Sequence, residues 1–177
     1  MISQAMAQRL STQINRELYS AYFYLGLSAQ AESMNLRGVA AWFFAKHGEE
    51  QTHALKMYRY LIDQGATVAF SDVAAPASVE RGVLPMFERT LEHERSVTAA
   101  INELVDQALS EKDHATHIFL QWFITEQIEE EATVDDIIGR VRLFGDQGQS
   151  LLMIDNELGA LAKQMATGAT PASSTAA

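Results

Sequence analysis

Four long segments of this chain each interrupt an apolar helical stripe with carboxylate, amide or imidazole side chains near mid-length. In a helical bundle, residues at alternating spacings of four and three face the core, so each stripe can be read from the sequence. The polar residues on these stripes are Glu17, Glu50, His53, Glu94, Gln127 and Glu130. At a rise of about 1.5 Å per residue, they fall at a similar depth in four packed helices. The sequence therefore predicts that four helices bring these side chains to one polar spot.

The expected fold is all-α, a four-helix bundle with one long crossover connection and a short fifth helix. Pro occurs only 3 times, and no segment shows the two-residue alternation of a half-buried strand. The expected helices cover residues 3–33, 35–64, 81–109, 114–143 and 149–165. Asn35 is the expected N-cap of the second helix. The stretch 66–80 has no helical period, and its length predicts that it crosses from one end of the bundle to the other.

Residues 1–165 are expected to form a single domain, followed by a small, polar and disordered tail over 166–177. The net charge of −10 argues against a partner with a phosphate backbone and favours the attraction of cations. The absence of Cys excludes disulfides, zinc ribbons and iron–sulfur clusters. The first eleven residues show neither a secretory signal nor a membrane span, so we expect a cytoplasmic protein with no membrane partner.

Carboxylates on buried stripes need a compensating positive charge. Removing an unpaired ionised carboxylate from water costs several kcal/mol. The four glutamates on the stripes match the charge of two divalent cations, and without metal some of them should hold protons. A lone Glu-x-x-His, such as Glu50 to His53, is more often an ordinary surface pair. Its occurrence at one level with ligand types on three other helices predicts a dinuclear metal centre, for which carboxylates and an imidazole suit iron.

Three stretches, residues 15–20, 48–54 and 121–131, resemble bacterial non-haem ferritins. The resemblance covers about residues 1–165. It implies a homo-oligomeric cage of twenty-four subunits that oxidises Fe(II) with O2 or H2O2 at a di-iron centre and stores the ferric mineral inside. It further implies that Glu17, Glu50 and His53 bind the first iron, with Glu50 bridging, and that Glu94 and Glu130 bind the second.

The same resemblance assigns several residues around the centre. Gln127 would position oxygen or water, and Tyr24 would donate a hydrogen bond or an electron to the centre. Trp122 is a second conceivable electron source, although an aromatic residue at this spacing is more often core. A third iron site is implied at the four glutamates Glu49, Glu126, Glu129 and Glu130. The alternative for these outer glutamates is a solvated acidic face.

Haem is not expected. A bacterioferritin would repeat Glu-x-x-His on its fourth helix, where this chain has Thr133, and would carry a haem-ligating methionine at the position of Gln51. Four methionines of this chain are interpreted as core or interface residues. They are Met34, Met57, Met86 and Met153.

Two further regions match features of the family. The segment 149–165 matches a fifth helix, whose apolar residues are expected at a subunit contact. These residues are Leu151, Leu152, Ile154, Leu158 and Leu161. Asp113, His114 and His117 lie where the family has ion-entry pores, although exposed histidines at a helix start are more often unremarkable.

Two other functions stay open at this point. A storage-only cage subunit would lack oxidase activity, but such subunits lose the central ligands, and this sequence retains them. A helical bundle that serves as an interaction module without metal would need another partner for its buried polar residues.

Overall fold

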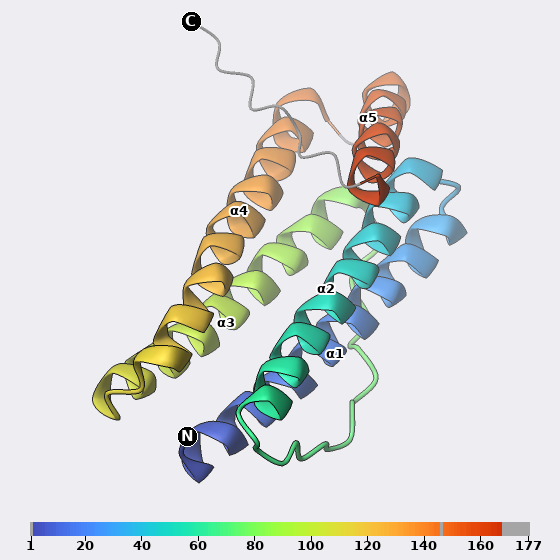
Figure 1. Ribbon diagram of the computed structural model, residues 1–177. Coiled ribbons are helices and arrows are strands. Elements are labelled where there is room, and N and C mark those ends of the chain that lie inside the picture. Colours follow the sequence, from blue (N-terminus) through green and yellow to red (C-terminus); the bar gives the residue numbers. More distant parts are fainter. Residues whose placement is uncertain (1, 146, 168–177) are drawn as a thin grey trace, which may run out of the picture.

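The computed structural model describes residues 2–145 and 147–167, which form five helices (Figure 1). Their bounds are α1 Gln4–Ser33, α2 Arg37–Asp63, α3 Val83–Ser110, α4 His114–Phe144 and α5 Gly148–Ala166. The predicted all-α fold is confirmed, and every predicted helix end lies within two residues of the observed one. Of the predicted tail, Ala166 ends α5, and residues 168–177 lie outside the described residues. No helix in the described part of the chain is long and apolar enough to span a membrane.

The connection between α2 and α3 runs along α1 from one end of the bundle to the other, as predicted (Figure 1). Near the first half of α1, Asn15 Nδ2 donates to the backbone oxygen of Ser71 at 2.6 Å. Near its last turns, Gln30 Nε2 donates to the backbone oxygen of Val79 at 3.1 Å. The crossover makes the bundle from two hairpins, α1 with α2 and α3 with α4, because each pair is joined by a short turn.

The start of α2 differs from the prediction. Asn35 is not the N-cap, because it adopts φ 60° in the turn that precedes the helix, a conformation that asparagine tolerates better than most residues. The free N–H groups of α2 are satisfied from another helix: Gly38 N and Val39 N donate to Asp155 Oδ1 of α5 at 2.8 and 2.9 Å. A carboxylate from α5 thus supplies the cap that local sequence does not.

Replacing Asp155 with Ala should lower the free energy of unfolding by about 1–2 kcal/mol, because two backbone donors of α2 lose their acceptor. The measurement is urea unfolding followed by far-UV circular dichroism. Asn156→Ala is the matched control, since Asn156 is the exposed neighbour on α5. Equal losses in the two variants would contradict a capping role for Asp155.

Helix α5 packs closely on α2. A Cβ placed on Gly38 would lie only 1.6 Å from the backbone oxygen of Asp155, so only glycine allows this approach. Ile154 and Leu158 are buried in the core of their own chain. The prediction that they lie at a subunit contact is therefore wrong. An apolar stripe on a helix shows that it needs a partner, but the stripe does not show which partner.

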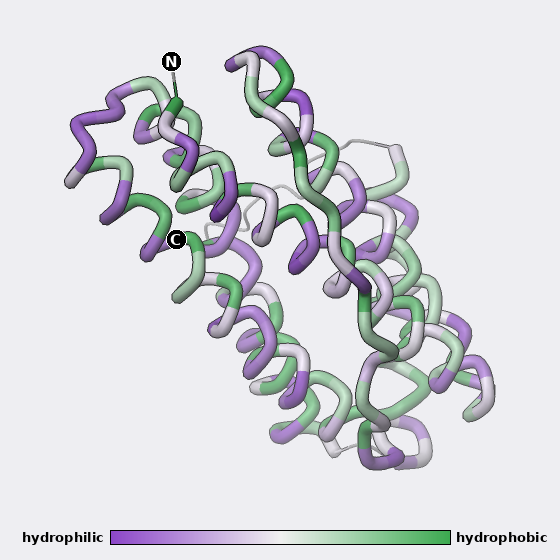
Figure 2. The backbone as a smooth tube through the Cα atoms, turned by 90° about the horizontal axis from the view of Figure 1, so that it is seen from below, coloured by the Kyte–Doolittle hydropathy of each residue, from purple (hydrophilic) through white to green (hydrophobic). Residues whose placement is uncertain are grey.

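The core consists of two apolar clusters at different levels of the bundle. One is built around Trp42, Phe43 and Phe87, and the other around Leu10 and Leu120. Figure 2 shows the green, hydrophobic segments turned toward the neighbouring helices. The predicted polar residues lie between the two clusters along the chain, so the fold places them at the waist of the bundle.

On α1 and α4, the residues that the spacing of four and three places in the core are buried. On α3, the buried positions shift away from this spacing toward the end of the helix. Thr98 and Val105, which lie on the stripe that spacings of four and three extend from Glu94, are half-buried, whereas Val97 and Leu104 are buried. A straight helix has 3.6 residues per turn, so a strict seven-residue pattern rotates away from the core by about 20° per repeat. Glu94 lies at the middle of α3, where the two patterns still coincide.

Candidate metal centre

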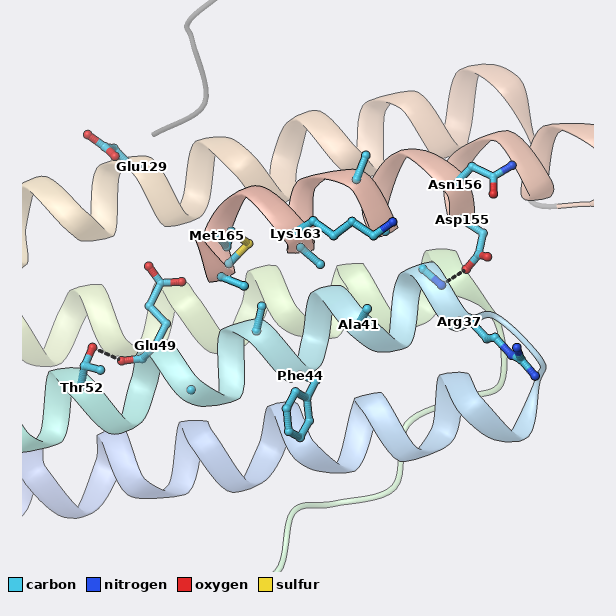
Figure 3. Close-up of a pocket in the computed structure, with 17 residues that line it drawn as sticks. Arg37, Ala41, Phe44, Glu49, Thr52, Glu129, Asp155, Asn156, Lys163 and Met165 are labelled. Atoms are coloured by element: carbon cyan, nitrogen blue, oxygen red, sulfur yellow. Dashed lines mark hydrogen bonds between the residues drawn. The ribbon is translucent and has the colours of Figure 1, made fainter. Parts of the chain in front are cut away.

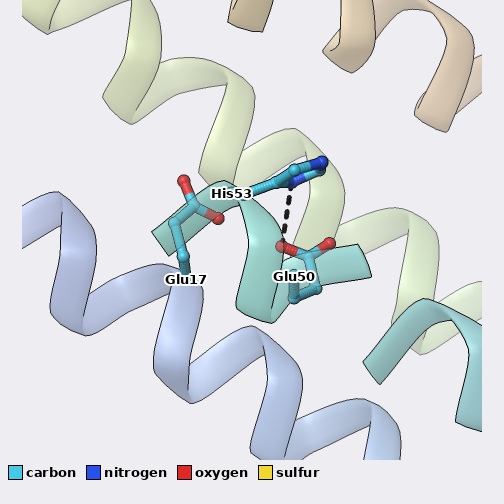
Figure 4. Close-up of side chains that lie close together, drawn as sticks. All are labelled: Glu17, Glu50 and His53. Atoms are coloured by element: carbon cyan, nitrogen blue, oxygen red, sulfur yellow. Dashed lines mark ion pairs between the residues drawn. The ribbon is translucent and has the colours of Figure 1, made fainter. Parts of the chain in front are cut away.

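Three of the predicted ligands lie together in the core. Glu17 comes from α1, and Glu50 and His53 come from successive turns of α2 (Figure 4). One ligand atom from each of the three lies within 4.8 Å of the others, and all three side chains are buried. His53 Nδ1 is 3.4 Å from Glu50 Oε2, the contact that an i,i+3 spacing produces on a helix.

The carboxylate of Glu17 is only half satisfied. Its Oε1 accepts a hydrogen bond from Gln13 Nε2 at 2.9 Å. Its Oε2 is buried and is the one side-chain oxygen or nitrogen, among the buried residues that the structure describes, without a hydrogen-bond partner. Such atoms are rare in proteins because their desolvation is uncompensated. A carboxylate oxygen that faces another carboxylate and an imidazole is the donor set of a divalent cation, so these residues fit a metal ion.

Glu94 of α3 and Glu130 of α4 extend the polar group to the other hairpin. Both are buried, and neither belongs to a group of three ligand atoms within 4.8 Å in the described chain. Glu94 accepts hydrogen bonds from the Tyr24 hydroxyl and, at 3.1 Å, from Gln127 Nε2. Both glutamates act electrostatically on Glu50. The structure therefore brings side chains from four helices to one level, in two unequal halves.

Lys46 is a member of this group that we did not predict as a functional residue. It is buried on α2, one turn before Glu50, and its Nζ donates to Glu130 Oε1 and, at 2.8 Å, to Glu49 Oε2. The sequence did contain a signal, because Lys46 occupies the apolar stripe of α2. A lysine is almost never fully buried unless it is paired with an acid. Gln13, four residues before Glu17 on the same face, could have been found by its spacing.

The outer glutamates are only partly brought together. Glu49, His53 and Glu126 form a second group whose ligand atoms lie within 4.8 Å of one another. Glu49 and Glu129 line a groove of about 1170 Å³ that runs along α2 and α5 (Figure 3). Glu129 is exposed, and Glu130 is held by Lys46. The third iron site at all four glutamates stays a prediction.

The two remaining candidate roles also stay predictions. The Trp122 ring lies edge-on to His53 at 5.3 Å, with Lys56 Nζ 3.7 Å from its centre. Asp113 caps α4 by accepting from Thr116 N at 3.0 Å, and His114 is exposed at the same helix start. An electron donated by Trp122 and a pore at the start of α4 are compatible with these positions.

Residues 7–144 match the model of a protein family described as the ferritin-like domain. This chain belongs to the ferritin family. It is 38% identical over 155 residues to a bacterial non-heme ferritin of Campylobacter jejuni, covering 88% of this chain and 93% of that one. It is 35% identical over 164 residues to a bacterial non-heme ferritin of Escherichia coli O157:H7, covering 93% and 99%. A solved open pore ferritin from Archaeoglobus fulgidus is similar with a TM-score of 0.88 and 42% identity, covering 90% and 98%.

Burial controls protonation at the centre of this ferritin. Desolvation, reinforced by the neighbouring Glu50, raises the pKa of Glu17 well above its ordinary value. Desolvation and the charge of Glu94 likewise raise the pKa of Glu50. Desolvation raises the pKa of Glu130 to about 7, although Lys46 opposes the shift. Without metal, these carboxyl groups therefore hold protons at a pH where exposed glutamates have lost theirs.

The metal-free protein should lose stability as the pH rises from about 5 to about 8. The folded-state pKa values lie above the unfolded value, so the folded chain binds more protons in this range. The stabilisation is complete below the unfolded pKa and disappears as the pH passes the folded pKa. For Glu130, a rise from 4.5 to about 7 corresponds to roughly 3 kcal/mol.

Chemical unfolding in the presence of a chelator, repeated across this pH range, measures the effect. Glu17→Gln should be more stable than the parent above about pH 7, because the amide imitates the protonated acid and still accepts from Gln13. Glu32→Gln, an exposed change on the same helix, should leave the pH profile unaltered. A metal-free protein whose stability rises steadily with pH would contradict the assignment of raised pKa values.

Proposed function

We propose that this ferritin oxidises Fe(II) to Fe(III) at a di-iron centre within each chain and stores the ferric product inside a cage of twenty-four copies. The observation that carries the proposal is the buried group of Glu17, Glu50 and His53, whose Glu17 has an oxygen with no partner. Glu94 and Glu130 lie beside this group on the second hairpin. Five ligand residues in two halves suit two iron ions better than one.

The chain's own residues support a division of roles. Glu17 and His53 would bind the first Fe(II), and Glu94 and Glu130 the second. Glu50 would contact both ions, because it lies beside the first pair and interacts electrostatically with the second. Two Fe(II) ions supply two electrons, which with two protons reduce O2 to H2O2 or H2O2 to water. Tyr24 would fix the rotamer of Glu94 through its hydroxyl, so the ligand is oriented before iron arrives.

The proposed cage draws support from the surface of the chain. Large apolar side chains that this chain leaves exposed lie on all five helices and in the crossover segment. They include Tyr22, Leu25, Phe44, Leu55 and Phe70. Apolar surface of this kind is typical of contacts between subunits. Similarity to bacterial non-heme ferritins over 93% and 99% of their lengths also supports the proposed cage.

The test begins with metal-free protein mixed anaerobically with Fe(II), after which oxygen is admitted. Oxidation is followed by near-ultraviolet absorbance and particle mass by light scattering. We expect oxidation much faster than in buffer, with a rapid phase of about two Fe(II) per chain, in particles far larger than one chain. Oxidation at the rate of buffer would refute the oxidase, and a monomer would refute the cage.

A further inference from the structure

The ammonium group of Lys46 lies between carboxylates of two helices. It donates to Glu49 Oε2 on its own helix at 2.8 Å and to Glu130 Oε1 on α4. Its side chain is 5% exposed, and it is the single lysine or arginine among the buried residues that the structure describes. A buried lysine at this level is therefore part of the polar group rather than of the surface.

The two partners of Lys46 connect different parts of the centre. Glu130 belongs to the buried carboxylates beside Glu50. Glu49 belongs to the outer group with His53 and Glu126, and it also lines the groove along α2 and α5 (Figure 3). Lys46 takes one oxygen from each glutamate and leaves the other oxygen free. The ammonium group of Lys46 thus links a carboxylate of the buried group to a carboxylate of the outer group, as a metal ion bound between them would.

The charges balance with Lys46 included. When all are ionised, the four buried glutamates of the centre and Glu49, the second partner of Lys46, carry five negative charges. The four buried glutamates are Glu17, Glu50, Glu94 and Glu130. Two divalent cations and one ammonium group carry five positive charges. A further divalent ion beside Glu49 would have to share its carboxylate with the ammonium group, and like charges so close repel each other strongly in a site of low dielectric.

We propose that Lys46 takes the place of a third metal ion, limiting each chain to two firmly bound ions and keeping the outer carboxylates of Glu49 and Glu126 from holding one, since His53 already serves the first ion. This inference rests on the proposed di-iron centre. Lys46 is thereby a specificity-determining residue for how many ions the chain binds.

The test counts bound metal rather than activity. Metal-free protein is dialysed against Zn(II), which has no redox chemistry, and the bound ions per chain are measured. We expect about two for the parent and about three for Lys46→Gln, because a neutral side chain frees both glutamates. Lys46→Met, which has no donor, should give the same gain. Lys46→Arg should keep the parent value.

A double variant shows where the added ion binds. Lys46→Gln combined with Glu49→Gln should return to about two ions, because the outer group loses a ligand. Far-UV circular dichroism and particle mass establish that each variant is folded and assembled. A purely structural lysine would change the melting temperature of these variants without changing the number of bound ions.

The outcomes separate the two proposals. A parent that binds about two ions together with a Lys46→Gln variant that also binds two would overturn the role of Lys46 and leave the di-iron centre intact. A parent that binds three ions would likewise overturn the role of Lys46 and leave the di-iron centre intact. A parent that binds no Zn(II) would overturn the metal centre itself, and with it any inference drawn from it.

Discussion

Replacing both Glu50 and His53 with Ala should reduce the initial rate of Fe(II) oxidation by more than about 100-fold. The change removes two of the three side chains whose ligand atoms lie within 4.8 Å of one another, and it removes the carboxylate that interacts with both halves of the centre. Changes to residues that only orient ligands already cost roughly 10- to 100-fold, so loss of the ligands should cost more.

The helical fold should survive this double change. The carboxylate of Glu50 is buried without metal at a cost, because burial raises its pKa. The melting temperature of the metal-free variant should therefore be close to that of the parent, while the increase in melting temperature on adding Zn(II) should disappear.

Stopped-flow absorbance at low Fe(II) measures the first turnover before mineral accumulates. Asp63→Asn is the matched control, an acidic residue that is exposed at the end of the same helix. It should oxidise Fe(II) at the parent rate. If the variant with Ala at both Glu50 and His53 kept the rapid phase, oxidation would have to take place elsewhere on the protein.

Replacing Gly38 with Ala should detach α5 from α2. The added Cβ would lie 1.6 Å from the backbone oxygen of Asp155 and 3.0 Å from the backbone nitrogen of Gly159, and backbone atoms cannot rotate aside as side chains do. The helices would have to separate, breaking the bonds from Asp155 to the start of α2 and exposing Leu158. We expect a loss of about 3 kcal/mol or more, at the upper end of overpacking effects.

Gly139→Ala is the control for this change. Gly139 lies inside α4, and nothing lies within 4 Å of a Cβ placed there. Alanine should therefore raise the stability by about 0.5–1 kcal/mol through its higher helix propensity. Urea unfolding and light scattering report stability and assembly for both variants. An unchanged unfolding curve for Gly38→Ala would mean that α5 does not dock as described.

Much of the bundle could be predicted because helical periodicity is a local property. Glu17 and Glu130 were placed in the core by counting fours and threes, and the structure buries both. The crossover followed from the length of the segment without a period. What spacing could not supply is which residues touch across helices. Glu94 was therefore assigned correctly to the core, while its contacts with Tyr24 and Gln127 became visible only in the structure.

The residues that were missed or misplaced share one cause, because their roles depend on a partner distant in sequence. Asn35 was expected to cap α2, but the acceptor comes from Asp155, more than a hundred residues later. Lys46 lies on the apolar stripe of α2, and its role becomes clear only from its hydrogen bond to Glu130 of the other hairpin. Leu158 is predicted at a subunit contact, because an apolar helix face does not show which surface covers it, and the structure places it in the core of its own chain.

The two hairpins hold their own helices more firmly than they hold each other, since α1 packs mainly on α2 and α3 mainly on α4. The polar waist lies where the hairpins meet, with Glu17 and Glu50 on one side and Glu94 and Glu130 on the other. A metal centre with ligands on both sides, as proposed, would tie one hairpin to the other. Without it, the hairpins should part more readily, so amide hydrogen exchange at the waist should quicken. A subunit starved of iron would then be cut by proteases sooner than a loaded one, and the supply of metal would set how long the protein lasts.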